Sequence, residues 1–390
     1  MLEEIRVRDY KSFAGPVTIP LKPITVLLGK NNSGKTAIAR LPISLSSALA
    51  KRTFGSSALR AGELGLGTTF RDIVHRKSAH AVLGLGLTLV DDEARRSVDV
   101  EIQLLQSLAE EKAILSSFMS KNPDFEGRWQ GGPGGRELEQ GPHLDGLFPA
   151  PIEGESKSQL EVLRDAIAKF AHRSRHLHSV RAPLMAAYEV RDPGSTGDTG
   201  GSDAAHELYH SESLQEAVAD WYQANLGARL EVVSEAATFY LSLRNKDRTN
   251  VNLARAGQGL RQLLPVVVAL QDAVTNPSPN RLIVVEEPEL HLHPAAHGGV
   301  ADLFVQAAES GRSQVLVETH SENFVLRLRR RAATGELKPE DVSFLWFEEN
   351  DGVSTIHEIT VDSNGRLSDW PDGVFSEDLE EVRAIAQART

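Results

Sequence analysis

The chain has 390 residues, of which 41% are hydrophobic and 25% charged, as is ordinary for a globular protein with a substantial core. A net charge of −12 excludes an overall polycation, and the absence of cysteine excludes disulfides and thiolate metal sites. The first residues lack the layout of a signal peptide and the apolar runs are too short to span a bilayer, so we expect a cytoplasmic protein without membrane contact.

The first fifty residues predict three strands, a phosphate-binding loop and a helix. Leu2–Arg8 alternates apolar and charged residues, and apolar runs follow at Val17–Leu21 and Ile24–Leu28. The next segment, Gly29–Thr36, reads Gly-Lys-Asn-Asn-Ser-Gly-Lys-Thr and fits the P-loop pattern G-x-x-x-x-G-K-[ST]. A strand before the motif and a helix from Ala37 onward form the setting that a P-loop requires.

The chemistry of a P-loop needs these residue types at this spacing. Glycines let the backbone curl so that its N–H groups point at phosphate oxygens, and the following helix aims its positive end at the same anion. Lys35 would reach the β- and γ-phosphates, and the Thr36 hydroxyl would bind Mg²⁺. We therefore predict an ATP–Mg²⁺ site whose phosphate-binding residues are Gly29, Lys30, Asn31, Asn32, Ser33, Gly34, Lys35, Thr36 and Ala37.

The middle of the chain predicts a β layer and a helical insertion. Ala81–Val90 and Ser97–Leu104 are strand candidates that, with the first strands, indicate an antiparallel layer beside the P-loop sheet. Glycine and proline are frequent in Glu126–Ser158, which we expect to be a loop. Ser156–Ala171 is amphipathic and Ser213–Leu226 begins with a Ser-x-x-Glu capping pattern, so both predict helices.

Short apolar strands alternate with helices in the second half. We expect strands at Ala236–Arg244, Arg281–Val285, Gln314–Glu318, Val342–Phe347 and Val353–Val361, and helices at Leu260–Val274, Ala295–Ser310 and Glu322–Ala333. The last two strands should form a hairpin over Asn350-Asp351-Gly352.

An acidic pair ends one of these strands. Leu282-Ile-Val-Val-Glu286-Glu287 has the layout of a Walker B motif, and two adjacent carboxylates at a buried strand end are costly unless a cation and water share the site. In that layout Glu286 would join Thr36 around Mg²⁺, and Glu287 would polarise the attacking water. The predicted catalytic residues are Glu287, His320 and Lys35.

Two further motifs accompany this pair. His320 ends the stretch Leu316-Val-Glu-Thr-His320, where its ring would contact the γ-phosphate, although alone such a histidine is more often structural. Gly257, Gln258 and Gly259 open a helix just before the Walker B strand, so their N–H groups can bind a phosphate; the alternative is a turn and an ordinary helix start.

The order of these motifs resembles the ABC-type ATPase heads of the SMC, RecF and OLD proteins. Glu287-Pro-Glu-Leu-His-Leu-His-Pro294 and Glu318-Thr-His-Ser-Glu322 are most similar to the OLD-like (AAA15) ATPases of bacteria, and Asp369–Phe375 resembles the C-terminal segment of a DUF3696-type subgroup. The resemblance covers residues 1–50 and about 250–375 well. It implies an α/β fold, a P-loop NTPase of the ABC-type head class with a mixed central sheet, an antiparallel β layer and a helical insertion.

On this basis we divide the chain into four parts. An N-terminal ATPase lobe with Walker A spans 1–90, and an insertion of helices and glycine-rich loops spans 91–250. A C-terminal ATPase lobe with signature, Walker B and H-loop spans 251–335, and a hairpin and tail span 336–390. OLD nucleases continue into a Toprim domain, whereas only about 55 residues follow Gly335, so we expect no nuclease in this chain.

The resemblance also implies partners. ATP would lie at the interface of a head-to-tail homodimer, or a higher even-numbered oligomer, where Lys35 of one subunit faces the signature of the other. The signature residues are Gly257, Gln258, Gly259 and Arg261, and His293 falls where the D-loop crosses the dimer. Arg261 stands where serine is usual, Glu286 stands where typical ABC proteins have aspartate, and we identify no Q-loop glutamine. A separate effector, a nuclease or toxin of an anti-phage or DNA-maintenance system, is the implied protein partner.

Several alternatives stay open at this stage. The pair His291 and His293 could bind a metal, and the basic stretches His172–His178 and Arg327–Arg331 could bind DNA or RNA or be solvated faces. The leading interpretation is an ATP-hydrolysing dimeric switch. The alternatives are an ATP-bound scaffold with negligible turnover that holds an effector, and a RecF-like DNA-repair clamp.

Overall fold

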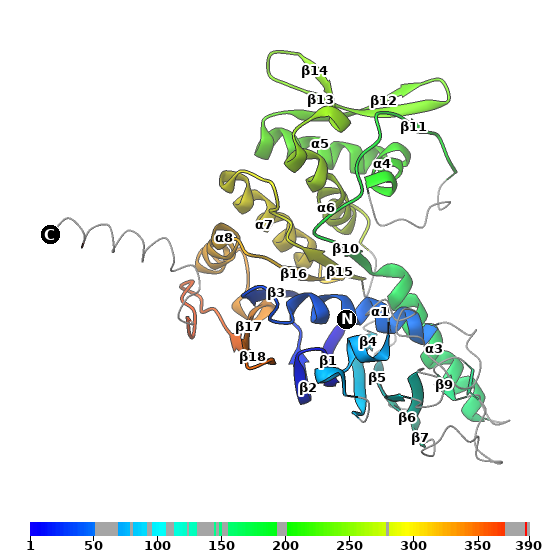
Figure 1. Cartoon of the computed structure of the whole chain (residues 1–390). Helices are drawn as coiled ribbons and strands as arrows, with labels where there is room; N and C mark the ends of the chain where they lie inside the picture. Colours follow the sequence, from blue (N-terminus) through cyan, green and yellow to red (C-terminus); the bar gives the residue numbers. More distant parts are fainter. Residues whose placement is uncertain are drawn as a thin grey trace.

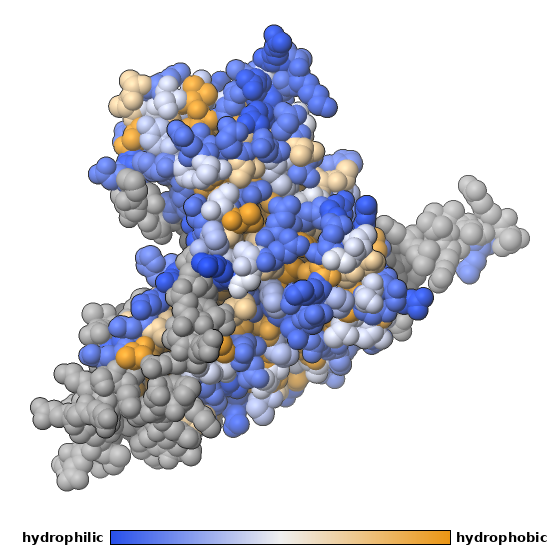
Figure 2. All heavy atoms as spheres, turned by 180° about the vertical axis from the view of Figure 1, so that it is seen from behind, coloured by the Kyte–Doolittle hydropathy of each residue, from blue (hydrophilic) through white to orange (hydrophobic). Residues whose placement is uncertain are grey.

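The chain folds into an antiparallel sheet, a mostly parallel central sheet and a mixed helical unit, arranged one after another (Figure 1). The structure is a computed structural model that describes residues 1–50, 69–78, 81–91, 96–106, 113–122, 125–130, 144–145, 148–149, 155–192, 201–277, 281–370 and 387. Within these ranges, no helix combines the length and the apolar character that crossing a membrane would demand. Figure 2 shows one face, where hydrophobic residues are scattered among hydrophilic ones, as on most globular proteins.

The central sheet has the strand order β10-β15-β16-β3-β17-β18. Its strands are β10 (Arg175–Leu177), β15 (Arg281–Glu286), β16 (Ser313–Glu318), β3 (Ile24–Gly29), β17 (Val342–Asn350) and β18 (Val353–Ile359). All pairings are parallel except the β17–β18 hairpin, so the predicted mixed sheet and hairpin are confirmed. Strands β3, β15 and β16 are almost continuously buried, as expected for parallel strands covered on both faces.

The antiparallel sheet has the order β2-β1-β4-β5-β6-β7. Its strands are β1 (Leu2–Tyr10), β2 (Phe13–Pro20), β4 (Leu83–Asp91), β5 (Arg96–Gln106), β6 (Ala113–Asn122) and β7 (Phe125–Gln130). The predicted antiparallel layer is confirmed, and it continues across the division expected at residue 90 because β4 pairs with β5. The prediction of a loop over 126–158 is wrong at β7 and at the next helix, which both lie partly in this range. Two short strands, β8 (Leu144–Asp145) and β9 (Phe148–Pro149), also lie in it. The rest of the range lies outside the described residues.

Helices cover both faces of the central sheet. On one face α1 (Lys35–Ala50) and α3 (Glu155–Arg173) pack between it and the antiparallel sheet, where Leu27, Leu282 and Leu316 join their core. On the other face lie α6 (Gln258–Thr275), α7 (Pro294–Glu309) and α8 (Glu322–Ala333), whose core includes Val26, Val285 and Val317. Because side chains alternate along a strand, each central strand contributes to both cores.

The remaining elements form the unit at the far end of the molecule (Figure 1). Helices α4 (Gly201–His210) and α5 (Glu212–Leu226) pack with α6 below a small sheet of β11 (Tyr188–Glu189), β12 (Arg229–Glu235), β13 (Thr238–Arg244) and β14 (Asn250–Asn252). The capping residue predicted for α5 is wrong. Ser211, in an extended conformation, accepts the N–H of Leu214, whereas Ser213 already lies inside the helix.

Short helical elements connect the larger ones. They are α2 (Phe70–Ile73), η2 (His75–Lys77), η3 (Leu253–Arg255) and η4 (Pro339–Asp341). The segment from α2 to η2 reaches the turn between β1 and β2, where Lys11 N donates to Ile73 O at 2.7 Å. The segment from α2 to η2 also lines one cavity together with the loop that joins β3 to α1.

One buried side chain connects the two large sheets. Gln314 of β16 accepts the N–H of Leu2 at 3.0 Å and donates to the carbonyls of Leu2 and Lys22 at 2.9 and 3.0 Å. These bonds hold the start of the antiparallel sheet against the central sheet, and they are buried or nearly so, which makes leaving their partners unpaired costly.

We predict that Gln314→Ala lowers the free energy of unfolding by about 3 kcal/mol, since three hydrogen bonds at about 1 kcal/mol each are lost. Urea unfolding followed by circular dichroism measures this change. The control is Gln306→Ala on the exposed side of α7, which should change the value by less than about 0.5 kcal/mol. Equal effects of the two substitutions would contradict the role of Gln314.

Candidate functional site

The loop between β3 and α1 has the shape that its sequence motif predicts. Gly29 and Gly34 adopt φ values of +142° and +94°, a region that favours glycine. A Cβ on Gly29 would lie 2.3 Å from the carbonyl oxygen of Phe347, and one on Gly34 would lie 2.8 Å from Ser12 Oγ. Both glycines are therefore required by the backbone and by the close approach of neighbouring chain segments.

The lysine of the motif folds back over this loop. Lys35 is buried, and its Nζ donates to the carbonyls of Gly29 and Lys30 at 2.9 and 2.7 Å. Burial lowers the pKa of Lys35 below its ordinary value, an effect that the nearby carboxylates of Glu318 and Glu287 oppose. The ammonium group of Lys35 therefore lies against the backbone of the P-loop, and the carboxylates of Glu318 and Glu287 only partly offset its loss of hydration.

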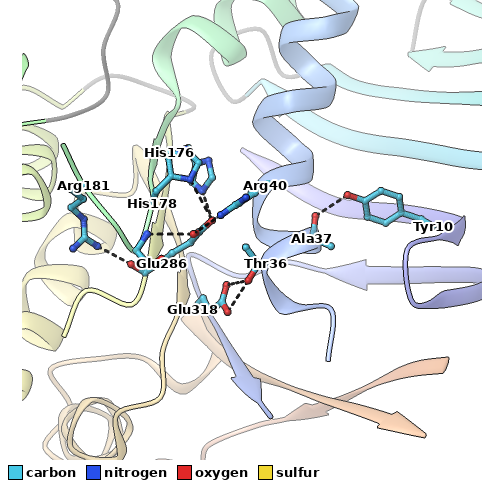
Figure 3. Close-up of polar contacts among 10 residues, drawn as sticks. Tyr10, Thr36, Ala37, Arg40, His176, His178, Arg181, Glu286 and Glu318 are labelled. Carbon is cyan, nitrogen blue, oxygen red and sulfur yellow. Dashed lines mark hydrogen bonds and ion pairs between the residues drawn. The ribbon is translucent and has the colours of Figure 1, made fainter. Parts of the chain in front are cut away.

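Three side chains from the ends of β15 and β16 meet near this lysine. Glu287, Glu318 and His320 each place one ligand atom so that all three atoms lie within 4.8 Å of one another. Thr36 Oγ1 donates to Glu318, with distances of 3.0 Å to Oε1 and 2.8 Å to Oε2 (Figure 3). Burial raises the pKa of Glu318 and lowers that of His320, because both charged forms lose hydration.

These groups surround a cavity of about 830 Å³. Its lining residues are Tyr10, Lys11, Ser12, Asn31 to Ala37, Arg40, Arg71, Asp72, Val74, Arg76, Lys77, Glu287, Glu318, His320, Glu349 and Gly352. The hydroxyls of Ser12 and Ser33 are buried and have no hydrogen-bond partner within the described residues. Unpaired hydroxyl donors beside a lysine and a glycine-rich turn fit a bound phosphate group.

The cavity unites part of the predicted site. The P-loop residues from Asn31 onward, Glu287 and His320 line it together. Glu318 and Arg40 were missed, as were the cations Arg71, Arg76 and Lys77. Glu318 stands two residues before His320 at a strand end, so its position carried a signal. Nothing in the sequence pattern connects residues 71–77 to the P-loop.

Glu286 lies in a different environment from the one its motif predicts. Arg40 Nε and Nη2 donate to its two carboxylate oxygens at 2.7 and 2.9 Å, and His176 Nε2 lies 2.8 Å from Oε1 (Figure 3). Burial disfavours the ionised form, but the bonds from Arg40 and His176 lower the pKa of Glu286 to about 2. The carboxylate that accepts the Thr36 hydroxyl is that of Glu318, and the role of Glu286 at a bound metal stays a prediction.

Chain geometry explains this difference. Strand β16 lies between β15 and β3, so Glu286 is one strand farther from the P-loop than Glu318. Glu287, by contrast, has a left-handed φ of +43° and donates its N–H to Glu318 O at 2.7 Å. This strained conformation, uncommon for a residue other than glycine, turns the chain toward the cavity directly after Glu286.

The predicted signature residues lie away from the P-loop cavity of the same chain. Gly257 caps α6, and a Cβ on Gly259 would lie 2.3 Å from the carbonyl oxygen of His291. Arg261 Nη1 donates to Ala254 O at 3.2 Å, and His293 caps α7 by accepting the N–H of Ala295. None of these side chains belongs to the cavity lining, so one described chain holds two separate parts of the predicted site.

Two buried groups outside the predicted site support these motifs. Glu289 accepts the Thr319 hydroxyl at 2.7 Å and the His320 N–H at 2.8 Å, and burial raises its pKa. Arg181 Nη2 donates to the carbonyl of Glu286 at 2.7 Å, and its backbone pairs with the side chain of Gln262 in α6. The ends of β15 and β16 are thus held by side chains from separate segments.

The two basic stretches are largely engaged within the chain. Arg327 and Arg331 bind Asp302, with shortest distances of 2.6 and 2.8 Å. Arg329 donates to Gly365 O and lies over the ring of Trp370. Further ion pairs join Arg175 to Glu207 and Asp272. Arg330 is the exposed residue of the α8 run, so this face offers less positive charge than its sequence indicates.

The two histidines for which metal binding was an open alternative make other contacts. Gln258 Nε2 lies 3.1 Å from His291 Nε2, while His293 caps a helix. In the described part of the chain, potential metal ligands group instead as Glu287, Glu318 and His320, and as His176, His178 and Glu286. Arg40 already binds both oxygens of Glu286, so the second group forms an ion-pair network.

Comparison with known families gives two matches in sequence. The family described as "AAA domain, putative AbiEii toxin, Type IV TA system" matches residues 24–327. "Protein of unknown function (DUF3696)" matches residues 337–385, which confirms the segment predicted from the tail. No curated protein matches the chain.

Solved structures show the fold. An SMC head bound to the C-winged helix domain of ScpA has 11% identity and a TM-score of 0.53, covering 92% of this chain and 97% of that chain. The SMC head domain from Thermotoga maritima has 13% identity and a TM-score of 0.49, with 91% and 98% covered. A Pyrococcus furiosus head with an extended coiled coil, bound to the C-terminal domain of ScpA, has 11% identity and a TM-score of 0.49, with 100% and 99% covered. The predicted fold of a P-loop ATPase head is confirmed.

The ion pair of Glu286 makes a pH-dependent prediction. Its folded pKa of about 2 lies below the ordinary value of 4.5, so its ionised form stabilises the fold above about pH 4.5, and this stabilisation is lost as the pH falls toward 2. The difference in unfolding free energy between wild type and Glu286→Gln should therefore shrink by about 2 kcal/mol between pH 6 and pH 3. Urea unfolding at several pH values measures it. A difference that stays constant over this range would show that Glu286 is not held as an ion pair.

Proposed function

The chain belongs to the family of AAA domains described as putative AbiEii toxins of type IV toxin–antitoxin systems, within the SMC/RecF-like ABC-type ATPases, and from this premise we propose that it is an ATP-hydrolysing switch. The observation that carries the proposal is the cavity in which Lys35 and Thr36 of the P-loop meet Glu287 and His320. Phosphate-binding and water-activating groups are rarely found together by chance at the ends of adjacent parallel strands.

The P-loop, Glu287 and His320 have distinct roles in this proposal. The P-loop N–H groups and Lys35 bind the β- and γ-phosphates and neutralise charge there, which is the main task in phosphoryl transfer. Glu287 orients the attacking water and accepts its proton, while His320 stabilises the γ-phosphate from the end of the neighbouring strand. Mg²⁺, when bound beside Thr36, supplies additional positive charge to the phosphates.

The signature residues support a dimer. They lie outside the P-loop cavity of their own chain, so a second copy in a head-to-tail arrangement would bring Gly257, Gln258, Gly259 and Arg261 to the phosphates. His293, at the start of α7, would lie near the same interface. ATP binding would then close the dimer and hydrolysis would open it, a switch that a separate effector protein can read.

The partner is proposed from the family description and from the OLD-like motifs. Both point to a bacterial defence or toxin–antitoxin setting in which a nuclease or toxin is the effector. A RecF-like clamp on DNA is less well supported, because Arg327, Arg329 and Arg331 are engaged within the chain.

A second candidate is an ATP-bound scaffold with negligible turnover. Arg261 replaces the usual signature serine and donates to Ala254 O, so its guanidinium is partly committed within its own chain. Steady-state phosphate release separates the two functions: a rate no higher than that of a variant without the P-loop lysine favours the scaffold.

We predict that Lys35→Ala abolishes measurable ATP binding, since the buried ammonium is the main cation at the mouth of the P-loop. Isothermal titration calorimetry with ATP provides the measurement. Lys338→Ala, which removes an exposed lysine near η4, is the matched control and should bind ATP like wild type. Wild-type affinity in Lys35→Ala would overturn the assignment of the P-loop.

We predict that Glu287→Gln retains ATP and Mg²⁺ but hydrolyses ATP at least about a hundredfold more slowly, as expected when a positioned base is lost. Removing the charge also relieves repulsion with the γ-phosphate, so the variant should run as a dimer, or a larger even-numbered assembly, on size exclusion with ATP. Glu309→Gln, an exposed substitution of the same kind in α7, serves as the control. Hydrolysis at the wild-type rate would mean that another group activates the water, with His320 or Glu289 the first candidates.

A further inference from the structure

Two turns bring the proposed hydrolytic side chains to the cavity. The β15 turn, residues 287–293, begins with Glu287 and ends with the cap of α7. The β16 turn, Thr319-His320-Ser321, contains His320 and ends with the cap of α8. Helices α7 and α8 pack against each other (Figure 1), and the turns that lead into them are in contact.

One link between the two turns is made next to His320. Glu289 of the β15 turn accepts the hydroxyl of Thr319 at 2.7 Å and the N–H of His320 at 2.8 Å, both at Oε1. These bonds hold the start of the β16 turn. Its end, at Ser321, is held by a different residue.

His297, in the first helical turn of α7, makes this second link. Its Nδ1 lies 2.7 Å from Ser321 Oγ, and its Nε2 lies 3.3 Å from the carbonyl oxygen of Leu292 in the β15 turn. A carbonyl can only accept, so Nε2 carries the ring proton and Nδ1 accepts the hydroxyl proton of Ser321. Burial lowers the pKa of His297, which favours this neutral form. The ring therefore bridges the ends of the two turns.

Ser321 depends on this ring for its hydroxyl proton. The residue is buried, its Oγ accepts the N–H of Phe324 at 3.1 Å, and its own N–H donates to Thr319 Oγ1 at 3.0 Å. In the part of the chain that the structure describes, Nδ1 of His297 is the acceptor for the hydroxyl proton. Removing the ring would leave a buried donor unpaired, which is costly, so the β16 turn would shift toward another partner.

Neither helix needs His297 in order to begin. Helix α7 begins at His293, whose side chain accepts the N–H of Ala295, and helix α8 begins at Ser321, whose side chain accepts the N–H of Phe324. Caps of this kind satisfy the free N–H groups of a helix start. What His297 adds is the connection between the two turns, which neither cap provides.

We propose that His297 is a positioning residue, which ties the β16 turn to the β15 turn and thereby holds His320 toward the γ-phosphate. The proposal rests on the proposed function, because it assigns a support to the histidine that acts there. The same turn carries His291 and His293, of which His293 is placed at the proposed dimer interface. Closure of the dimer would therefore reach His320 through the ring of His297.

The first test compares His297→Leu, which removes both hydrogen bonds, with His297→Gln, whose amide can both donate and accept. In steady-state phosphate release, we expect kcat of His297→Leu to fall at least about tenfold, because a small displacement of a positioned group costs this much. KM for ATP should stay within about threefold, since the P-loop is untouched, and His297→Gln should recover kcat to within about threefold of wild type. The control is His210→Leu, which removes an exposed ring bonded to the carbonyl of Arg191 in the far unit and should leave kcat unchanged.

The second test does not depend on turnover. Histidine rings labelled with carbon-13 are observed by nuclear magnetic resonance, without nucleotide and with Mg²⁺ and the non-hydrolysable analogue AMP-PNP, and His320→Gln identifies the signal of His320. We expect the His320 signal to be alike in wild type and His297→Gln, and to be shifted or broadened in His297→Leu. Circular dichroism establishes that each variant is folded.

Three results would overturn the role of His297. They are an unchanged His320 signal in His297→Leu, a wild-type kcat in that variant, and a His297→Gln variant that recovers neither the signal nor kcat. A wild-type protein that binds AMP-PNP without hydrolysing ATP is a different result. It would overturn the proposed hydrolysis, while the comparison of His320 signals would still decide whether His297 positions that ring.

Discussion

The parallel pairing of β16 between β3 and β15 is the constraint on which the candidate site depends. It aligns the ends of three strands at one edge of the sheet, where the P-loop, the Glu287 turn and the Thr319-His320-Ser321 turn follow. Ligands of open α/β sheets bind at such edges, because the turns that leave the carboxyl ends of neighbouring strands lie side by side. The hydrogen bonds of Glu289 to Thr319 and His320 then hold two of these turns together.

A second consequence of the same sheet is an ionic network around the buried carboxylate of Glu286. Arg40 comes from the P-loop helix, Glu286 from β15 and His176 from the edge strand β10. Arg181, a few residues beyond β10, reaches the carbonyl of Glu286 and pairs with Gln262 of α6. Breaking one partner of such a network leaves a buried charge, which is far more costly than the net contribution of the intact network. The network therefore keeps α1, β15 and α6 in one arrangement.

Much of this architecture could be predicted from sequence, because local patterns carry it. Neighbouring residues alone predict the P-loop, the apolar strands β3, β15 and β16, and the hairpin at Gly352. Strand order cannot be predicted in this way, since it depends on pairings between residues hundreds of positions apart. The contact of Thr36 with Glu318 was missed for that reason. Strand β10, with three residues, is too short for a periodic signal, and the cations of residues 71–77 reach the cavity only through tertiary packing.

The placement of β3 in the sheet has a consequence for the order in which the protein is made. Strand β3 lies at residues 24–29, whereas both of its neighbours follow almost three hundred residues later in the chain, at 313–318 and 342–350. At elongation rates of roughly 5–20 residues per second, its partners leave the ribosome tens of seconds later, whereas β1 and β2 can pair at once. The apolar P-loop strand therefore has neither of its sheet neighbours until they have been synthesised. A nascent chain has no assembled nucleotide cavity before β16 and β17 have emerged.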